Sequence, residues 1–233
     1  MSGHYVVRKV TRPDPAVVAG LREAGVATVH EAAGRTGLVS PEIAPRQEGA
    51  VIAGPAVTVS CPPGDNLMIH AAVEMCEPGD VLVVTTTSPS ADGMFGDLLA
   101  TSLLARGVAG LVTAAGVRDI AALREMGFPV WARAVCAQGT VKASPGSVNV
   151  PVVCGGSAVR PGDVVIADDD GVLCLPARSA PGVLERARAR IAAEEDKREA
   201  FSSGVLGLDL YGLRDLLTRL GVRYVDELPE DGA

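Results

Sequence analysis

The chain has 233 residues, of which 48% are hydrophobic and only 3% are aromatic, a composition that suits one sizeable α/β domain and not a disordered chain. Its formal net charge of −7 and the lack of a basic run argue against a nucleic-acid binder, which normally carries a basic patch. No apolar run reaches the roughly 18 residues that a membrane-spanning helix needs. Residues 1–13 also lack the apolar core of a signal peptide. We therefore expect a soluble, cytoplasmic protein.

The cysteines predict a reducing environment. Their number is odd and no CxxC spacing occurs, so we expect free thiols that fill small spaces in the core. They are Cys61, Cys76, Cys136, Cys154 and Cys174.

The first ninety residues alternate short helices and strands. A helix is expected from Pro15 to about Ala24, because Asp14 supplies a cap before a proline suited to the first turn. The valine-rich alternation of residues 50–61 predicts a strand, with Gly54-Pro55 as a break or bulge. Further helices are expected over 26–37 and 67–76, a loop over 40–47 and a strand over 81–86.

The candidate site is organised around residues 96–119. Asp97 is followed by an apolar run with small residues, which predicts a buried helix that ends near Arg106-Gly107. A short strand and small residues then lead to Arg118 and Asp119. Because a helix–strand unit folds back on itself, we expect the two ends of this segment to meet. The N–H groups of the first helical turn favour a carboxylate and could also hold an anionic substrate.

Strands become adjacent in the second half of the chain, so the sheet should be mixed. Pro78-Gly79 and Pro161-Gly162 each predict a type II turn that feeds a strand. The expected strands are 108–112, 129–137, 148–154, 164–167 and 172–175, and the expected helices are 120–127, 181–201 and 211–220. The last two helices are charged and amphipathic, and could form an arm that packs on a neighbouring subunit.

Asp97, Arg118 and Asp119 are the first candidates for a functional site. An Arg–Asp pair is most often a structural salt bridge, and the residues alone leave this alternative open. The pair nevertheless follows an apolar strand and small residues that leave room for a ligand, and ligands of open α/β folds bind at strand ends. Arginine also suits bidentate recognition of a small carboxylate.

The sequence lacks the residue spacing of a zinc site. The histidines form no HxxxH or HxxE pair, and His30 and His70 are more consistent with packing or hydrogen bonding than with metal binding. Asp168-Asp169-Asp170 could bind a cation, although three carboxylates before a glycine are typical of a solvated turn. Gly64-Asp65-Asn66 could cap the following helix, or could present Asn66 to a substrate. A hard ion held by carboxylates and water stays open.

A longer pattern is more specific. Asp97, twenty intervening residues and Arg118-Asp119 form a D-x20-R-D pattern, by which the chain resembles the RraA-like family. Within that family it is similar to the class II pyruvate aldolases that cleave 4-hydroxy-4-methyl-2-oxoglutarate and 4-carboxy-4-hydroxy-2-oxoadipate. The likeness covers nearly the whole chain and includes residues 28–32, 34–38, 62–66, 92–93, 95–100, 138–142, 146–149, 167–172 and 206–209. The shorter RraA proteins, which bind and inhibit a ribonuclease, lack the long C-terminal arm.

The resemblance implies a fold and an assembly. The fold would be the RraA-like α/β sandwich of swivelling-domain type, with a mixed sheet and a C-terminal helical arm. It implies one domain over residues 1–233, with the arm at about 178–233 packed on a neighbouring subunit of a homo-oligomer, either a trimer or a hexamer.

The resemblance also implies a role for each site residue. Asp119 would be the direct ligand of Mg²⁺ (or Mn²⁺), and Asp97 would hold a metal-bound water. Arg118 would grip the pyruvyl part of the substrate and stabilise the enolate that forms. The backbone N–H groups of Leu98 and Leu99 would bind the substrate carboxylate.

Three further features follow from the same resemblance. Glu194 of a neighbouring subunit would complete the metal shell through water, with Glu195 as the alternative. Ala114 stands where relatives usually carry an acid, which puts the local hydrogen-bond network in question. No Schiff base is required, so Lys142 and Lys197 need not be catalytic.

The expected activity is that of a divalent-metal-dependent aldolase acting on a small 2-oxo acid. It would cleave 4-carboxy-4-hydroxy-2-oxoadipate or 4-hydroxy-4-methyl-2-oxoglutarate to pyruvate plus oxaloacetate or pyruvate, with oxaloacetate decarboxylation as a side activity. Two alternatives stay open. One is a non-catalytic RraA-like regulator that binds a ribonuclease, and the other is a dedicated oxaloacetate decarboxylase.

Overall fold

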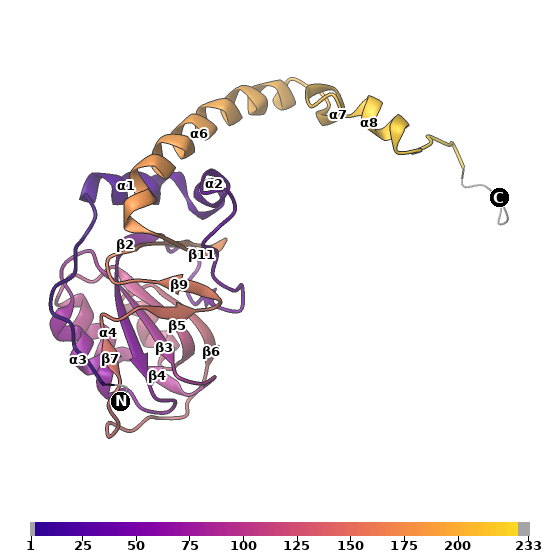
Figure 1. The fold of residues 1–233 in the computed structure, drawn as a ribbon. Helices are drawn as coiled ribbons and strands as arrows, with labels where there is room; N and C mark the ends of the chain where they lie inside the picture. The colour runs from indigo at the N-terminus through magenta and orange to yellow at the C-terminus, as the bar shows by residue number, and fades with distance from the viewer. Residues whose placement is uncertain (1–2, 228–233) are drawn as a thin grey trace. The chain divides into compact units, whose positions relative to one another are not determined.

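In the computed structural model, which describes residues 3–227, the chain divides into two compact units between Arg188 and Ala189. The first unit has the mixed α/β architecture that the sequence predicts, with helices and strands that alternate loosely along the chain (Figure 1). Among the described residues, no helix combines the length and the apolar character needed to cross a bilayer.

Within residues 3–227, nine strands form one mixed sheet that organises the first unit (Figure 1). They are β1 (Ala44–Pro45), β2 (Ile52–Cys61), β3 (Val81–Thr86), β4 (Gly93–Phe95), β5 (Gly110–Val117), β6 (Val130–Val135), β7 (Ser147–Val148), β10 (Val164–Asp168) and β11 (Gly171–Leu175). The order across the sheet is β1-β6-β5-β3-β2-β10-β11, with β4 beside β5 and β7 beside β2. The central pairs β2–β3, β3–β5 and β5–β6 are parallel, whereas β1–β6, β2–β10 and β10–β11 are antiparallel. The strands β8 (Val152–Cys154) and β9 (Ser157–Val159) pair with each other.

Three apolar clusters surround this sheet. The helices α3 (Leu67–Met75), α4 (Asp97–Leu104) and α5 (Ile120–Glu125) contribute to the cluster that Leu82 and Val84 of β3 face. Val81 and Val83 of the same strand belong to the second cluster, as the two-residue period of a strand requires. The third cluster packs α1 (Pro15–Ala24), α2 (Val26–Ala32) and the start of α6 (Ala180–Ser202) against β10 and β11. Burial on both faces explains why the central strands are continuous apolar runs.

The strands differ from the sequence prediction in several places. β2 continues through Gly54-Pro55 without a break, and the strand changes its neighbour there, from β10 up to Pro55 to β3 from Ala56 onward. β5 runs to Val117 and so includes the small residues expected after a shorter strand. Residues 148–154 form parts of β7 and β8, because Asn149 adopts a left-handed backbone with φ 56°. The expected loop over 40–47 contains the two-residue strand β1.

The predicted turns and caps of the first unit are mostly confirmed. Gly79 and Gly162 have φ values of 86° and 82°, as type II turns require. A buried aspartate closes each turn, because Asp80 accepts from the backbone N–H of Glu77 and Asp163 from that of Arg160. α2 is shorter than expected and ends at Ala32.

The five thiols are free, as the sequence predicts, and four of them are buried. Burial raises the pKa of Cys61 and of Cys76 to about 12, so both remain protonated and unreactive at neutral pH.

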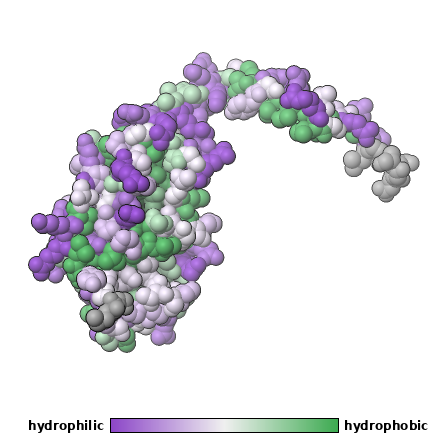
Figure 2. Space-filling model, viewed as in Figure 1, coloured by the Kyte–Doolittle hydropathy of each residue, from purple (hydrophilic) through white to green (hydrophobic). Residues whose placement is uncertain are grey.

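The second unit consists of the end of α6, followed by α7 (Gly207–Leu210) and α8 (Arg214–Arg219). The helix expected over 211–220 is shorter than predicted: α8 begins at Arg214, because the chain turns at Gly212, whose φ is 62°. Phe201 packs edge-on against Tyr211, with ring centroids 6.0 Å apart. Figure 2 shows apolar patches between hydrophilic ones along this unit. Its packing on a neighbouring subunit stays a prediction.

Candidate active site

Three predicted site residues meet where β5 ends and α4 begins. Asp97 is the first residue of α4, and Arg118 and Asp119 follow β5 directly. The Oδ2 atom of Asp119 lies 3.3 Å from Nε of Arg118 and accepts a hydrogen bond of 3.4 Å from the backbone N–H of Asp97. The expectation that the two ends of this segment meet is therefore confirmed. The roles of the three residues stay predictions.

Backbone geometry explains why these residues converge. Asp119 adopts a left-handed conformation with φ 57° and forms the N-cap position of α5, a conformation that aspartate tolerates better than most residues. The backbone N–H of Arg118 donates to the carbonyl of Phe95 at 2.9 Å. A Cβ at Gly96 would overlap Oδ2 of Asp119, so glycine is what allows this close approach.

The start of α4 offers backbone N–H groups to an anion. The first turn of a helix has no intrahelical acceptors for these groups, and they attract negative charge. The N–H of Leu98 already donates to Oδ1 of Asp97 at 2.7 Å. The N–H of Leu98 could therefore bind a substrate carboxylate, as predicted, only after its hydrogen bond to Asp97 breaks. The N–H of Leu99 takes no part in that hydrogen bond.

A small cavity of about 70 Å³ lies beside these residues. Asp97, Arg118 and Asn66 contribute to its lining. The Nδ2 group of Asn66 donates to the carbonyl of Met94 at 3.0 Å, and the buried Oδ1 has no hydrogen-bond partner within residues 3–227. Since a buried amide oxygen without a partner is costly, this atom is suited to accept a hydrogen bond from a ligand. Asp65, and not Asn66, caps α3, by accepting from the N–H of Leu67 at 2.9 Å.

Two further residues of this cavity were not singled out as site residues from the sequence. His70 and Lys142 line it, although His70 was expected to be a packing residue and Lys142 was set aside. Partial desolvation, together with the charge of Lys142, lowers the pKa of His70. Asn66 stands directly before α3, and His70 follows four residues later on the helix. This spacing places the two side chains on the same side and could have indicated His70 as a neighbour of Asn66. Lys142 comes from a loop far along the chain, so no sequence pattern indicates that it lies near α3.

The donor set fits a hard divalent cation. Asp97 and Asp119 are neighbours here, because the Asp119 carboxylate accepts from the backbone N–H of Asp97. Within residues 3–227, no group of three or more His, Cys, Asp or Glu side chains is arranged to hold a metal ion. Mg²⁺ is commonly bound by one or two carboxylates, with water and substrate as its other ligands. Asp119 and Asp97 would therefore hold such an ion with most of its coordination left to water and substrate.

The remaining candidates have contacts of their own. Glu194 and Glu195 lie in the second unit, where Glu194 pairs with Arg190 at 2.8 Å and Glu195 pairs with Arg198. The predicted role of either glutamate stays a prediction. Ala114 lines a different cavity from that of Arg118.

The acidic turn at residues 168–170 is structural. The Asp168 carboxylate accepts from the N–H groups of Val26 and Asp170, and the Asp169 carboxylate accepts from that of Gly49. These contacts attach the β10–β11 hairpin to neighbouring segments.

Comparisons with known proteins agree with this architecture. The family model RraA-like (Aldolase/RraA) matches residues 23–174. A protein of Halalkalibacterium halodurans that carries the provisional name 4-hydroxy-4-methyl-2-oxoglutarate aldolase is 34% identical over 178 residues, which is 76% of this chain and 84% of that protein. A Burkholderia multivorans protein with the same provisional name is 37% identical over 61% of this chain and 86% of its own length.

Solved structures extend the likeness to three dimensions. An uncharacterised protein of Pseudomonas syringae matches with a TM-score of 0.74 and 28% identity, over 84% of this chain and 92% of that one. Streptomyces coelicolor RraAS2, described as an unusual member of the RNase ES inhibitor RraA family, matches with a TM-score of 0.73 and 31% identity, over 81% of this chain and 98% of that one. The predicted fold is therefore confirmed, and the chain belongs to the RraA-like family.

Proposed function

We propose that this protein is a divalent-metal-dependent aldolase. It cleaves 4-carboxy-4-hydroxy-2-oxoadipate or 4-hydroxy-4-methyl-2-oxoglutarate to pyruvate plus oxaloacetate or pyruvate, and it also decarboxylates oxaloacetate. The provisional aldolase names of the Halalkalibacterium and Burkholderia relatives support the reaction class. The contacts of the Asp119 carboxylate with Arg118 and with the backbone N–H of Asp97, at the first turn of α4 and beside a small cavity, support the site most directly.

The pyruvyl end of the substrate would bind at Arg118 and the start of α4. A guanidinium and free helical N–H groups together suit a 2-oxo acid, whose carboxylate and keto oxygen both accept hydrogen bonds. Leu99 offers such an N–H, and Arg118 is 44% exposed, so its guanidinium remains accessible to a ligand. Mg²⁺ bound at Asp119 would act as a Lewis acid on the keto oxygen.

The bond changes balance without a Schiff base. The C4 hydroxyl loses its proton, the C3–C4 bond breaks, and the electron pair of that bond passes into the pyruvyl fragment as an enolate. Arg118 stabilises the developing negative charge, which is electrostatic preorganisation. A water held by Asp97 would take the proton from the C4 hydroxyl and return it to C3 of the enolate, which gives pyruvate. Loss of CO₂ from oxaloacetate leaves the same enolate.

His70 and Lys142, which also line the cavity, would bind the distal part of the substrate. Lys142 supplies a positive charge for a second carboxylate, and His70 lies beside it. The unpartnered Oδ1 of Asn66 would accept a hydrogen bond from a substrate hydroxyl. With Lys142 in this role, the protein should bind a dicarboxylic substrate more tightly than a monocarboxylic one.

The test is pyruvate release from oxaloacetate and from the two aldol substrates, followed with lactate dehydrogenase and NADH. We expect release that excess EDTA abolishes and Mg²⁺ restores, after subtraction of the metal-only background. Arg118→Ala should lose this release. The matched control is Arg133→Ala, which removes another partly exposed arginine, paired with Glu42, and should keep it. No release above background from any of the three acids would contradict the proposal. A much higher kcat/KM for oxaloacetate than for both aldol substrates would identify a dedicated decarboxylase.

A second candidate function is regulation of a ribonuclease. The likeness to RraAS2, whose description places it in a ribonuclease-inhibitor family, favours this candidate because it covers 98% of that chain. Inhibition of a purified RNase E-type enzyme, in the absence of pyruvate release, would support the regulator. Pyruvate release without inhibition would exclude it.

A further inference from the structure

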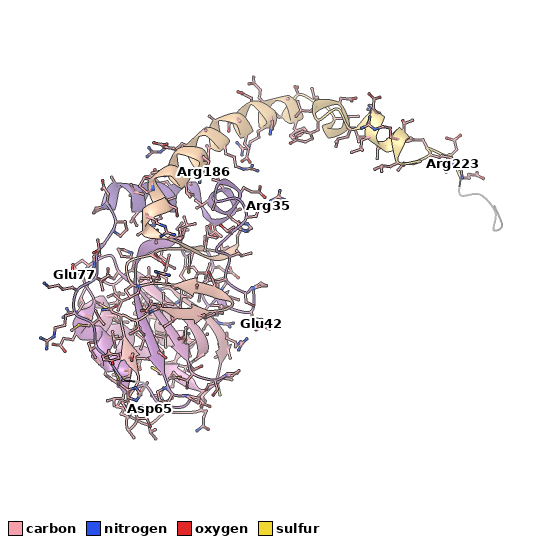
Figure 3. The ribbon with its side chains drawn as sticks, viewed as in Figure 1. Arg35, Glu42, Asp65, Glu77, Arg186 and Arg223 are labelled. Carbon is pink, nitrogen blue, oxygen red and sulfur yellow. The ribbon has the colours of Figure 1, made fainter. Side chains whose placement is uncertain are left out.

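Asp65 lies buried beside the cavity, although it does not line the cavity itself. Only 2% of its surface is exposed, and Figure 3 labels it at the end of the first unit away from Arg186. A buried carboxylate needs hydrogen-bond donors to offset its desolvation. The contacts of Asp65 therefore indicate what this residue is built to hold.

The two oxygens of Asp65 bind two different segments. Oδ1 accepts from the backbone N–H of Leu67 at 2.9 Å, which caps the start of α3. Oδ2 accepts from the N–H groups of Ala143 and Ser144, at 2.9 and 2.6 Å. A single side chain thus joins the helix start to a loop almost eighty positions along the chain.

Each joined segment carries residues of the cavity. Asn66 precedes α3 and His70 lies on its second turn, while Lys142 comes immediately before Ala143. Two backbone hydrogen bonds run alongside, from Val141 to the carbonyl of Gly64 at 2.9 Å and from Asn66 to the carbonyl of Val141 at 3.0 Å.

The loop has little else to hold it in this position. The side chains of Val141, Lys142 and Ala143 are all exposed, so apolar burial contributes little to their placement. Backbone hydrogen bonds, two of which end on Asp65, therefore fix the loop backbone from which the Lys142 side chain extends.

We infer that Asp65 is a positioning residue that fixes the Lys142 loop beside Asn66 and so sets the affinity of the cavity for the distal carboxylate of a dicarboxylic 2-oxo acid. This inference rests on the proposed function for the identity of the substrate. Asp65 acts through the loop and does not touch the substrate. Its effect should therefore appear in binding of the distal carboxylate and not in enolate chemistry at Arg118.

The variant Asp65→Asn tests this inference. It keeps the volume of the side chain but replaces one acceptor oxygen with an NH₂ group, which cannot accept from the loop and from Leu67 together. Asp163→Asn is the matched control, because Asp163 is also buried (8% exposed) and also accepts two backbone N–H groups, from Arg160 and Ala177, away from the cavity. Both variants should lose a similar amount of stability in urea.

Two substrates separate positioning from chemistry. 4-Hydroxy-4-methyl-2-oxoglutarate carries the distal carboxylate, which stays intact when the C3–C4 bond breaks, whereas pyruvate lacks it but still exchanges its methyl protons with D₂O through the same enolate. Asp65→Asn should raise KM for 4-hydroxy-4-methyl-2-oxoglutarate about tenfold, the scale expected for a lost charge-assisted hydrogen bond, and leave pyruvate exchange within about twofold. Asp163→Asn should change neither rate. Equal losses for both substrates, or an unchanged KM, would overturn the inference.

A double-mutant cycle tests the route through Lys142. If Asp65 acts by positioning Lys142, adding Asp65→Asn to Lys142→Ala should raise KM for 4-hydroxy-4-methyl-2-oxoglutarate no further, whereas independent effects would multiply.

Hydrogen exchange gives a readout that does not need activity. The amides of Ala143 and Ser144 should exchange faster in Asp65→Asn than in Asp163→Asn, since their acceptor is weakened. An inactive wild-type enzyme would contradict the proposed function. Amide hydrogen exchange, together with calorimetric binding of 4-hydroxy-4-methyl-2-oxoglutarate, would then decide the role of Asp65. Unchanged exchange at both amides would overturn the role of Asp65 whatever the activity.

Discussion

A Cβ atom at Gly96 would overlap Oδ2 of Asp119. The absence of a side chain at Gly96 lets the Asp119 carboxylate approach closely. The same carboxylate oxygen contacts the N–H of Asp97 and Nε of Arg118, and so joins the start of α4 to the end of β5. Any side chain at position 96 must therefore separate the residues that form the site.

Gly96→Ala should remove activity by displacing Asp119 and should destabilise the fold by about 1–3 kcal/mol, the usual cost of overpacking. Pyruvate release and urea unfolding measure the two effects. Gly182→Ala is the control, because a Cβ there makes only an ordinary contact with Arg186 at 3.5 Å, so stability and activity should remain near those of the wild type. Full activity in Gly96→Ala would contradict the importance of this contact.

Arg118→Ala should lower kcat for oxaloacetate at least a hundredfold, by about 3 kcal/mol of transition-state stabilisation. The guanidinium is 44% exposed, so the melting temperature should change little. Circular dichroism and the coupled pyruvate assay check both parts. Arg133→Ala should remain active, and near-wild-type turnover in Arg118→Ala would reject the site assignment.

Metal binding should depend on Asp119. Saturating Mg²⁺ at about 100 times its Kd should add about 2.7 kcal/mol to the free energy of unfolding of the wild type, and EDTA should reverse the shift. Asp119→Asn should lose this stabilisation, whereas Asp169→Asn, in the acidic turn, should keep it. Thermal unfolding with and without Mg²⁺ measures the difference, and an unchanged shift in Asp119→Asn would mean that the ion binds elsewhere.

Asp65 should make stability sensitive to acid. Burial alone would raise the pKa of this carboxyl, but hydrogen bonds from Leu67, Ala143 and Ser144 outweigh burial and lower the pKa. A lowered folded-state pKa contributes stability that is complete above the unfolded value of about 4 and is lost as the pH falls through the folded value. Urea unfolding between pH 2.5 and 7 should therefore show a smaller acid-dependent loss in Asp65→Asn. Curves of equal slope for the variant and the wild type would contradict the pKa shift.

Subunit mixing can test which glutamate of α6 serves the site. If the arm completes a neighbour's site, inactive Arg118→Ala subunits mixed with inactive Glu194→Gln subunits should recover part of the activity, because some hybrid sites carry neither change. Glu195→Gln should remain active by itself. Recovery with Glu195→Gln in place of Glu194→Gln would exchange the two assignments, and no recovery with either would contradict a shared site.

Much of the fold was predictable because its signals are local. Asp14-Pro15 marked the start of α1, and Pro-Gly pairs marked two turns whose glycines have the required positive φ. The predictions that failed concern pairing between distant segments. Gly54-Pro55 does not interrupt β2, because the strand changes neighbours at that point, and pairing partners are not encoded locally.

The sequence by itself determined the α/β class, the mixed sheet and the convergence of Asp97, Arg118 and Asp119, because both ends of one helix–strand unit supply these residues. Only the tertiary structure decided that Asn66, His70 and Lys142 line the same cavity and that Asp65 holds the Lys142 loop. These residues come from α3 and from a distant loop. Hydrogen bonds between segments far apart in the chain leave no periodic trace in the sequence.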